Sequence, residues 1–361
     1  LEPLNGLRVD MTRAIAEVKA LSAKSGLQVD PSTLVADLTV GEAQRVEILK
    51  ALYRGARILI LDEPTAVLSP PEVRDLWTVL RTLRENGGTV ILITHKLDEV
   101  IAVSDTITVM RAGMTVSRFA TAGTTPRDIA RAMVGRDVRL ALDAVATSAC
   151  VRVSGVAPAT RVAGLTVRSD RGTVAVNNLS FEIAPGEILG IAGVEGNGQT
   201  ELLEAIAGLR RPVSGSVFLG ERDMTAMAVR ERADAGLSHI PEDRHRRGLV
   251  LEFSIADNLI LGRQHHFSSM RGLDGERIAR NAAAQIQAFD IRPPIASLPA
   301  RALSGGNQQK IVIAREMGRP FTVLLAAQPT RGVDVGAIEF IHEQLRKARS
   351  EGKGILLVSA D

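Results

Sequence analysis

The feature that most constrains this chain is an internal repeat. The segment LTVGE at Leu38–Glu42 returns in modified form as LSGGN at Leu303–Asn307, an offset of 265 residues. At the same offset, the apolar run Val90–Ile93 falls on Ile355–Val358. A register that holds from position 38 to position 95 is not expected by chance, so the sequence predicts two copies of one domain.

Each copy is predicted to alternate strands and helices. Ala56–Leu61 and Thr89–Ile93 are short apolar runs of the kind that form buried strands in parallel sheets. Between them, Pro71–Glu85 has apolar residues at helical spacing and is followed by Asn86-Gly87-Gly88. A strand, a helix and a strand of these lengths form a βαβ unit, so we expect an α/β fold with a mainly parallel sheet.

Composition predicts where one domain ends and the next begins. Residues 143–164 are rich in Ala, Val, Ser and Thr and show no clear period. We interpret them as a linker between a first domain at 1–142 and a second domain at 165–361. The alternative is that this stretch is an irregular edge of one of the two domains.

Charge and composition exclude several classes of protein. With 44 Lys and Arg against 41 Asp and Glu, the net charge is only +3, and aromatic residues make up 3% of the chain. Proteins that read nucleic acids more often cluster basic charge and supply stacking rings, so we expect no nucleic-acid partner. A single cysteine, Cys150, excludes a disulfide framework and a multi-cysteine metal site. No apolar run reaches the ~18 residues that cross a bilayer, so we expect no membrane-spanning segment.

A glycine-rich loop in the second copy indicates phosphate binding. The predicted strand Glu187–Ala192 runs into GVEGNGQT at Gly193–Thr200 and then into a helical pattern. In this setting glycines let backbone N–H groups surround phosphate oxygens, and the helix N-terminus adds its dipole. Thr200 is placed to reach Mg²⁺, although a plain turn between strand and helix is the alternative. The candidate nucleotide-binding residues are Gly193, Gly196, Gly198, Gln199 and Thr200.

Two adjacent acids in the first copy predict hydrolytic chemistry. The apolar strand Ile58–Leu61 leads into Asp62 and Glu63. A carboxylate at the tip of a strand can hold a hydrated Mg²⁺, which is the role expected of Asp62. Its neighbour Glu63 can orient or deprotonate an attacking water. His95 follows the next predicted strand, so its imidazole is expected at an adjacent tip, where it can meet a γ-phosphate.

Together these motifs resemble those of the ATP-binding cassette (ABC) ATPases. LSGGNQQK at Leu303–Lys310 resembles the signature motif, ILILDEPT at Ile58–Thr65 the Walker B strand, and Gly193–Thr200 the Walker A loop. His95 is similar to the switch histidine. The resemblance implies ATP and Mg²⁺ as cofactors, catalysis by Glu63 and His95, and two tandem P-loop NTPase domains, each with a helical subdomain. It also implies that the signature contacts nucleotide through Ser304, Gly305, Gly306 and Gln308.

The duplicated arrangement resembles the two-cassette ATPase subunits of bacterial importers for simple sugars and nucleosides. IPEDR at Ile240–Arg244 and QPTRG at Gln328–Gly332 carry this closer resemblance. Glu242 takes the place of a glutamine that senses the transmembrane partner in most cassettes. The resemblance implies two transmembrane permease subunits, an extracytoplasmic substrate-binding protein, and a peripheral position at the cytoplasmic face of the membrane. The AAQPTRG string at Ala326–Gly332 favours a nucleoside over ribose or xylose, again by resemblance.

The two copies lack different parts of the family pattern. In the second copy the offset puts Ala327, Gln328 and Ala360 at the positions of the two acids and the histidine. Gln199 stands where the loop lysine is expected. The second signature is intact, whereas the first reads LTVGE at Leu38–Glu42. Cassettes of this family dimerise head to tail, so each site joins the Walker motifs of one copy to the signature of the other. We therefore predict one competent composite site and one degenerate site.

The repeat also predicts which parts of the two domains lie outside this chain. The offset places the lysine of a first Walker A loop before Leu1, so the first domain is expected to be truncated at its N-terminus and the second at its C-terminus. Leu1–Asp37, with apolar residues at helical spacing, is then expected to belong to the first helical subdomain. Without a first Walker A loop, we expect residues 1–361 alone to hydrolyse ATP negligibly. Two alternatives remain open: a soluble duplicated cassette protein that acts on ribosomes, and a non-catalytic truncated remnant.

Overall fold

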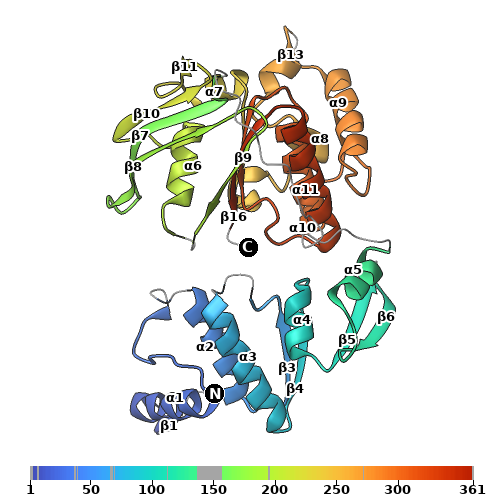
Figure 1. The fold of residues 1–361 in the computed structure, drawn as a ribbon. Helices are drawn as coiled ribbons and strands as arrows, with labels where there is room; N and C mark the ends of the chain where they lie inside the picture. Colours follow the sequence, from blue (N-terminus) through green and yellow to red (C-terminus); the bar gives the residue numbers. More distant parts are fainter. Residues whose placement is uncertain are drawn as a thin grey trace. The chain divides into compact units, whose positions relative to one another are not determined.

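The structure is a computed structural model that divides into two compact units, unit 1 at Leu1–Val138 and unit 2 at Arg139–Asp361 (Figure 1). It describes residues 3–5, 8–35, 38, 40–65, 68, 70–111, 113–135, 157–193, 196–270 and 272–359. The predicted boundary at 142 and most of the predicted linker lie outside these residues.

Unit 1 contains a parallel strand pair flanked by helices and two short antiparallel hairpins. Its described strands are β1 (Leu4–Asn5), β2 (Arg8–Val9), β3 (Ile58–Asp62), β4 (Thr89–Ile93), β5 (Thr106–Arg111) and β6 (Met114–Ala120). Its described helices are α1 (Met11–Ser25), α2 (Val40–Tyr53), α3 (Pro70–Glu85), α4 (Leu97–Val103) and α5 (Pro126–Val134). The strands and the helix of the predicted βαβ unit are confirmed as β3, α3 and β4.

The larger of the two apolar clusters in unit 1 lies on one face of the β3–β4 pair. Leu76, Trp77 and Leu80 of α3 are buried in one cluster with Leu59 of β3, as the helical spacing predicts. Burying each such side chain contributes about 1.5–3 kcal/mol. The opposite face of the pair is open, with four isoleucines that are 47–63% exposed. They are Ile58, Ile60, Ile91 and Ile93.

Unit 2 combines a parallel sheet with an antiparallel one. The parallel sheet has the order β12-β15-β16-β9, and the antiparallel sheet has the order β11-β10-β7-β8. The described strands are β7 (Thr160–Arg168), β8 (Val174–Ile183), β9 (Ile188–Ala192), β10 (Ser214–Leu219), β11 (Arg222–Asp223), β12 (Leu237–Ile240), β13 (Ser268–Ser269), β14 (Gly272–Leu273), β15 (Val323–Ala327) and β16 (Gly354–Ser359). The described α-helices are α6 (Gln199–Ala207), α7 (Val229–Asp234), α8 (Ile255–Leu259), α9 (Gly275–Ala288), α10 (Gly305–Met317) and α11 (Val335–Ser350).

Two apolar clusters cover the two faces of the parallel sheet in unit 2. On one face, Val323 and Leu325 of β15 are buried with Leu202 and Ile206 of α6. On the other face, Leu324 packs in a cluster with α10 and α11. Figure 1 shows α6 and α11 on opposite sides of strands β9 and β16. Because both faces are covered, these strands read as continuous apolar runs rather than alternating ones.

The sequence repeat coincides with a repeat of elements. β3, α3 and β4 of unit 1 correspond at the offset of 265 to β15, α11 and β16 of unit 2. The strand register is the same, because Ile58 pairs with Thr89 and Val323 pairs with Gly354. The uncovered isoleucine face of unit 1 therefore corresponds to the face of unit 2 that α6 covers.

The predicted linker ends inside a strand. Residues 160–164 belong to β7, which pairs with both β8 and β10 and buries Val162 and Leu165. Gly164 has a φ of +61°, and the strand register shifts between Val162 and Leu165. This irregularity interrupts the alternation of buried and exposed positions. The interruption explains why the end of the predicted linker shows no strand period in the sequence.

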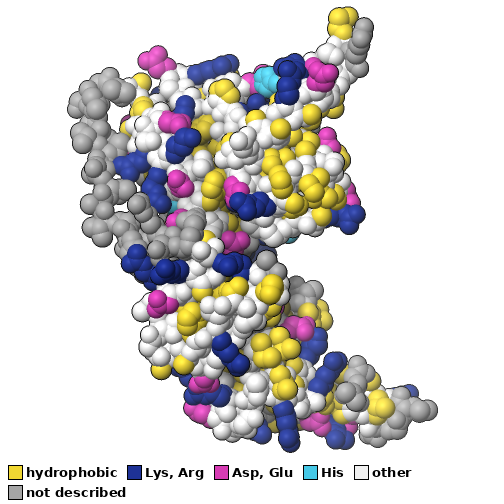
Figure 2. Space-filling model, turned by 90° about the vertical axis from the view of Figure 1, so that its right-hand side faces the viewer, with side chains coloured by type: hydrophobic (Ala, Val, Ile, Leu, Met, Phe, Trp, Pro, Cys, Tyr) yellow, Lys and Arg dark blue, Asp and Glu magenta, His cyan; other side chains and the backbone are white. Residues whose placement is uncertain are grey.

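The surface carries charge of both signs. On the face shown in Figure 2, Lys and Arg side chains are interspersed with Asp and Glu side chains and form no continuous basic stripe. Among the residues that the structure describes, no helix combines the length and apolarity needed to cross a bilayer.

Candidate functional site

Glu63 and His95 meet at the ends of two adjacent strands. β3 and β4 are parallel and Asp62 pairs with Ile93, so the residues that follow them leave the sheet at the same edge. His95 Nδ1 lies 2.6 Å from Glu63 Oε1. Both side chains keep access to solvent, with 39% of Glu63 and 18% of His95 exposed. A carboxylate held in this way can orient a water molecule beside a phosphate.

The backbone at Glu63 is strained. Its φ of +45° lies in the left-handed region that non-glycine residues seldom adopt. Its N–H donates a hydrogen bond to the Ile93 carbonyl at 2.8 Å, which ties the turn to β4. The repeat-related Gln328 has a φ of +43° and donates to the Val358 carbonyl at 2.8 Å. Unit 2 therefore keeps the same turn, although the Gln328 side chain carries no charge.

Glu99 on α4 connects the two segments that carry Glu63 and His95. Its carboxylate accepts hydrogen bonds from the Thr65 hydroxyl at 2.6 Å and from the Thr94 hydroxyl at 3.3 Å. Thr65 and Thr94 flank the two strand ends, so Glu99 ties these ends together. Glu99 could not be predicted from the sequence, because no pattern links a residue on α4 to a threonine 34 positions earlier.

Asp62 provides a carboxylate that could bind a magnesium ion in unit 1. It is the last residue of β3, and its side chain is exposed. Carboxylate oxygens at an open strand tip suit Mg²⁺, which binds through one or two carboxylates and keeps several waters. The exposed carboxylate therefore fits the predicted role of Asp62 as a Mg²⁺ ligand.

The glycine-rich loop of unit 2 joins β9 to α6, as predicted. Gly196 and Gly198 have φ values of +92° and +95°, where glycine is favoured. A side chain at Gly198 would also collide with the Ala175 carbonyl oxygen. The loop therefore presents backbone rather than side chains at the N-terminus of α6, which suits an anion. Val194 and Glu195 of this loop lie outside the described residues.

Gln199 occupies the lysine position of the loop and contacts the loop itself. Its side-chain oxygen accepts a hydrogen bond from the Asn197 N–H at 3.0 Å. A side chain at Gly193 would lie 2.6 Å from Gln199 Nε2, so the amide packs close to the start of the loop. A neutral amide in this place stabilises the loop but supplies no positive charge to a phosphate.

The Glu242 carboxylate lies between Thr200 and Arg331. The Thr200 hydroxyl donates to Glu242 Oε2 at 2.9 Å, and Arg331 Nη1 donates to Oε1 at 2.9 Å. Thr200 and Glu242 thus place a hydroxyl and a carboxylate side by side, which are oxygen ligands of the type that Mg²⁺ takes. This cluster could not be predicted from the sequence, since Glu242 and Arg331 are separated by 89 positions.

The signature motif forms the N-terminus of α10. Ser304 precedes the helix and is exposed, and the Asn307 side chain donates to its hydroxyl at 3.1 Å. A side chain at Gly305 would approach Arg244 Nη2 at 2.8 Å, and one at Gly306 would approach Asp334 Oδ2 at 2.9 Å. The glycines therefore let Arg244 and Asp334 pack closely against the first turn of α10, in which Gly306 is buried.

Gln308 lies inside unit 2 rather than at its surface. Its amide nitrogen donates to the Ala300 carbonyl at 3.1 Å, and its oxygen lies 2.8 Å from His245 Nε2. Its predicted contact with nucleotide stays a prediction, and the side chain holds the segment before the signature. Two other positions used in the sequence argument, Thr39 and Ala360, lie outside the described residues.

Comparison with known proteins identifies the family. Residues 4–66 and 176–331 match the family described as ABC transporter. The chain belongs to this family. It is 43% identical over 360 residues to the nucleoside import ATP-binding protein NupA of Lactococcus lactis subsp. cremoris (strain MG1363), covering 99% of this chain and 70% of that protein.

Two further relatives give the same result. The guanosine import ATP-binding protein NupO of Bacillus subtilis (strain 168) is 43% identical over 360 residues, covering 99% of this chain and 69% of that protein. The ribose import ATP-binding protein RbsA 1 of Rubrobacter xylanophilus is 39% identical over 352 residues, covering 97% and 68%. The chain is therefore an ABC transporter ATP-binding protein of the ATP-hydrolysing P-loop NTPase type, with an α/β fold and a parallel sheet.

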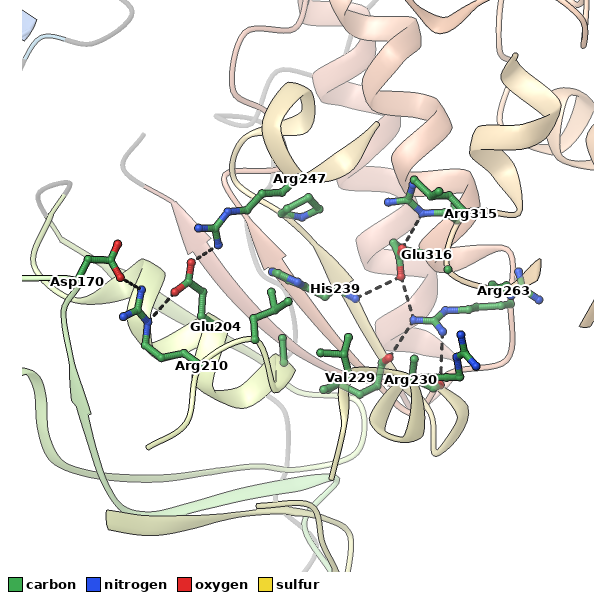
Figure 3. A pocket seen from close by; sticks show the side chains of 18 residues that line it. Asp170, Glu204, Arg210, Val229, Arg230, His239, Arg247, Arg263, Arg315 and Glu316 are labelled. Carbon is green, nitrogen blue, oxygen red and sulfur yellow. Dashed lines mark hydrogen bonds and ion pairs between the residues drawn. The ribbon is translucent and has the colours of Figure 1, made fainter. Parts of the chain in front are cut away.

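A pocket of 760 Å³ in this ABC protein is lined by none of the predicted nucleotide-binding residues. Figure 3 shows the side chains that line it. The pocket borders Glu204 and Ala207 in the C-terminal half of α6, whereas the glycine-rich loop precedes the N-terminus of that helix. Glu204 is buried, and its carboxylate lies between Arg210, at 2.7 Å, and Arg247. The arginines that line the pocket are Arg210, Arg230, Arg247, Arg263, Arg315 and Arg319.

His239 on the wall of this pocket makes the stability of unit 2 depend on pH. Burial lowers the pKa of His239 to about 4, below the usual value near 6.5. Between these values the unfolded chain binds a proton that the folded chain does not, so the free energy of unfolding falls as the pH is lowered. Because the ring borders the pocket, water offsets part of the effect, and we expect a loss of about 1–2 kcal/mol from pH 7 to pH 5.

Urea unfolding of the wild type and of His239→Gln at both pH values tests this expectation. The only tryptophan, Trp77, lies in unit 1, so circular dichroism is the suitable probe for unit 2. Burial also lowers the pKa of His342, but that contribution is common to both proteins. The variant should lose less stability than the wild type, and an equal loss would contradict the role of His239.

Proposed function

We propose that this chain is part of the ATPase subunit of an importer that takes up a nucleoside or a simple sugar, with hydrolysis at one competent composite site. The contact between Glu63 and His95, 2.6 Å long at the open edge of β3 and β4, carries this proposal. The relatives support the cargo class, because their names describe import of nucleosides, guanosine and ribose. Identity does not separate a nucleoside from a sugar, because the glucose import ATP-binding protein TsgD13 of Haloferax volcanii is also 43% identical. The preference for a nucleoside therefore depends on the AAQPTRG string at Ala326–Gly332.

The proposed subunit contains two fused cassettes. The shared element order and strand register at an offset of 265 support this duplication. In this proposal residues 1–142 form the first domain, 143–164 the linker and 165–361 the second domain. The last residues of the linker form part of β7. We propose that the Glu63 and His95 pair works with Ser304 of the other cassette.

The uncovered face of unit 1 supports a further part of the proposal. The four isoleucines at 58, 60, 91 and 93 are 47–63% exposed, whereas their repeat partners in unit 2 are at most 5% exposed beneath α6 and its neighbours. Leaving four large apolar side chains in water is unfavourable by about 25 cal/mol per Å² of apolar surface. We propose that a first Walker A loop and its helix cover this face in the longer protein.

The chemistry proposed for the competent site divides among three side chains. Mg²⁺, held by Asp62, would neutralise charge on the transferring phosphate. Glu63 would accept a proton from the attacking water and would be kept in place by His95 and by the turn at its own strained backbone. In the second site Thr200 and Glu242 would hold nucleotide and metal, but Gln328 offers no base.

The proposed partners are two transmembrane permease subunits and an extracytoplasmic substrate-binding protein, with the ATPase bound at the cytoplasmic face of the membrane. The test is reconstitution of the full-length subunit with its permeases in proteoliposomes that contain the binding protein. We expect ATP-dependent uptake of a labelled nucleoside, with weaker uptake of ribose. ATP hydrolysis that responds to ribosomes but not to permeases, or that is absent from the full-length protein, would overturn the proposal.

A further inference from the structure

Three polar side chains converge at one point on the surface of unit 2. Asp234 is the last residue of α7, and His265 and His266 lie in the short 3₁₀ helix Gln264–Phe267. One ligand atom from each side chain lies within 4.8 Å of the other two. All three side chains are exposed, so an ion from solvent can reach them.

The distances between the three side chains are compatible with metal ligation, although the contact between His265 and Asp234 is also a long hydrogen bond. Asp234 Oδ1 lies 3.3 Å from His265 Nε2 and 3.5 Å from His266 Nε2. A good N–H···O hydrogen bond is closer to 2.9 Å. In a tetrahedral zinc site with bonds of about 2.0–2.1 Å, neighbouring ligand atoms are separated by about 3.3–3.4 Å.

The orientation of the two histidines supports the same interpretation. Consecutive residues in a 3₁₀ helix point about 120° apart, because the helix has three residues per turn. The two imidazoles nevertheless turn toward the same carboxylate oxygen, and their ring centroids are 4.1 Å apart. The side chains thus adopt the arrangement that binding of one shared metal ion would require.

α7 and the 3₁₀ helix are both anchored to the rest of unit 2. The three ligand side chains are therefore positioned before a metal ion binds. Arg232 of α7 is buried and donates to the carbonyl oxygens of Ala205 and Ile206 at 2.8 and 2.7 Å. Phe267, at the end of the 3₁₀ helix, is also buried. A site whose ligands are positioned by packed neighbours binds with less ordering cost.

We propose that Asp234, His265 and His266 form a binding site for a divalent transition-metal ion, with Zn²⁺ as the expected occupant and water in the fourth position. Two imidazoles and one carboxylate suit Zn²⁺, whereas Mg²⁺ and Ca²⁺ prefer oxygen ligands alone. The inference goes beyond the importer function and does not depend on it.

Such an ion would also stabilise the walls of the arginine-lined pocket. Ala233 and Arg263 line that pocket, and they neighbour Asp234 and the 3₁₀ helix in the chain. The metal would therefore join the end of α7 to the segment that carries Arg263, which Figure 3 shows at one side of the pocket. The Arg263 cation also interacts with Asp234, so its charge competes with the metal.

Metal titration of the untagged chain in a Cys150→Ser background tests this proposal, since the thiol could otherwise bind zinc. After treatment with a chelator, Co²⁺ should bind one ion per chain and give the visible bands of tetrahedral cobalt, and Zn²⁺ should displace it. Asp234→Asn, His265→Ala and His266→Ala should each weaken binding at least tenfold, because each removes one ligand.

His342→Ala is the matched control, since it removes an imidazole from α11 and should leave the affinity unchanged. The three ligand side chains are exposed, so the variants should show the wild-type dichroism and melting temperature without metal. Binding only at millimolar zinc, or binding that survives all three substitutions, would overturn the proposed site.

Discussion

Glu63→Gln is expected to reduce steady-state ATP hydrolysis by the full-length subunit about 10²–10⁴-fold, the usual contribution of a general base. The substitution keeps the size of the side chain and removes the charge that polarises water. Glu63 is partly exposed, and its backbone is fixed by the Ile93 carbonyl, so the fold should tolerate the amide. ATP binding should change little, because the effect acts on the chemical step.

Hydrolysis assays of the permease-bound complex and nucleotide-binding assays together check this result. The matched control is Gln328→Ala, at the repeat-related position, which should leave hydrolysis largely unchanged. His95→Ala should lower the rate as well, and the Glu63→Gln/His95→Ala double variant should lose much less than the product of the single losses, since the pair acts as a unit. A Glu63→Gln complex with near-normal kcat would remove Glu63 from the catalytic role.

The βαβ unit of unit 1 could be predicted because its signals are local. The helix at Pro70–Glu85 shows its apolar stripe in the sequence, and Leu76, Trp77 and Leu80 of that stripe are buried. The contact between Glu63 and His95 could be anticipated for the same reason, since two parallel strands must end at one edge.

Other parts of the structure depend on contacts that no local pattern reveals. Glu242 meets Arg331 across 89 positions, and this pairing results from the packing of β12 and β15 rather than from spacing. Asp234 meets two histidines only because α7 and the 3₁₀ helix are each anchored by buried neighbours. Very short strands such as β13 carry too few residues to show an alternation.

The start of β7 was missed for a different physical reason. The irregularity near Gly164 breaks the period on which strand prediction depends, so a paired and buried strand reads as a linker. The strained turn at Glu63 is likewise invisible in sequence, because glutamate does not favour a positive φ. It is the surrounding hydrogen bonds that impose this conformation.

Ser304→Arg is expected to abolish hydrolysis and transport by the full-length complex. Ser304 is exposed before α10, and among the described residues its side chain caps none of the first helical amides, so the fold should survive its loss. In the proposed composite site, a bulky cation would displace the hydroxyl and block the approach to the γ-phosphate that we propose the first cassette holds. Restoring Ala327→Asp and Gln328→Glu should not create a second active site, because Gln199 would remain.

The central claim is that one site hydrolyses ATP and that it joins the acids of unit 1 to the signature of unit 2. The most direct test compares the steady-state ATPase of permease-bound Ser304→Arg with that of Thr39→Arg, the corresponding change in the first signature, whose residue lies outside the described ones. The asymmetric site predicts that Ser304→Arg eliminates activity while Thr39→Arg retains most of it. Equal losses from the two substitutions would mean two equivalent sites and would contradict the claim.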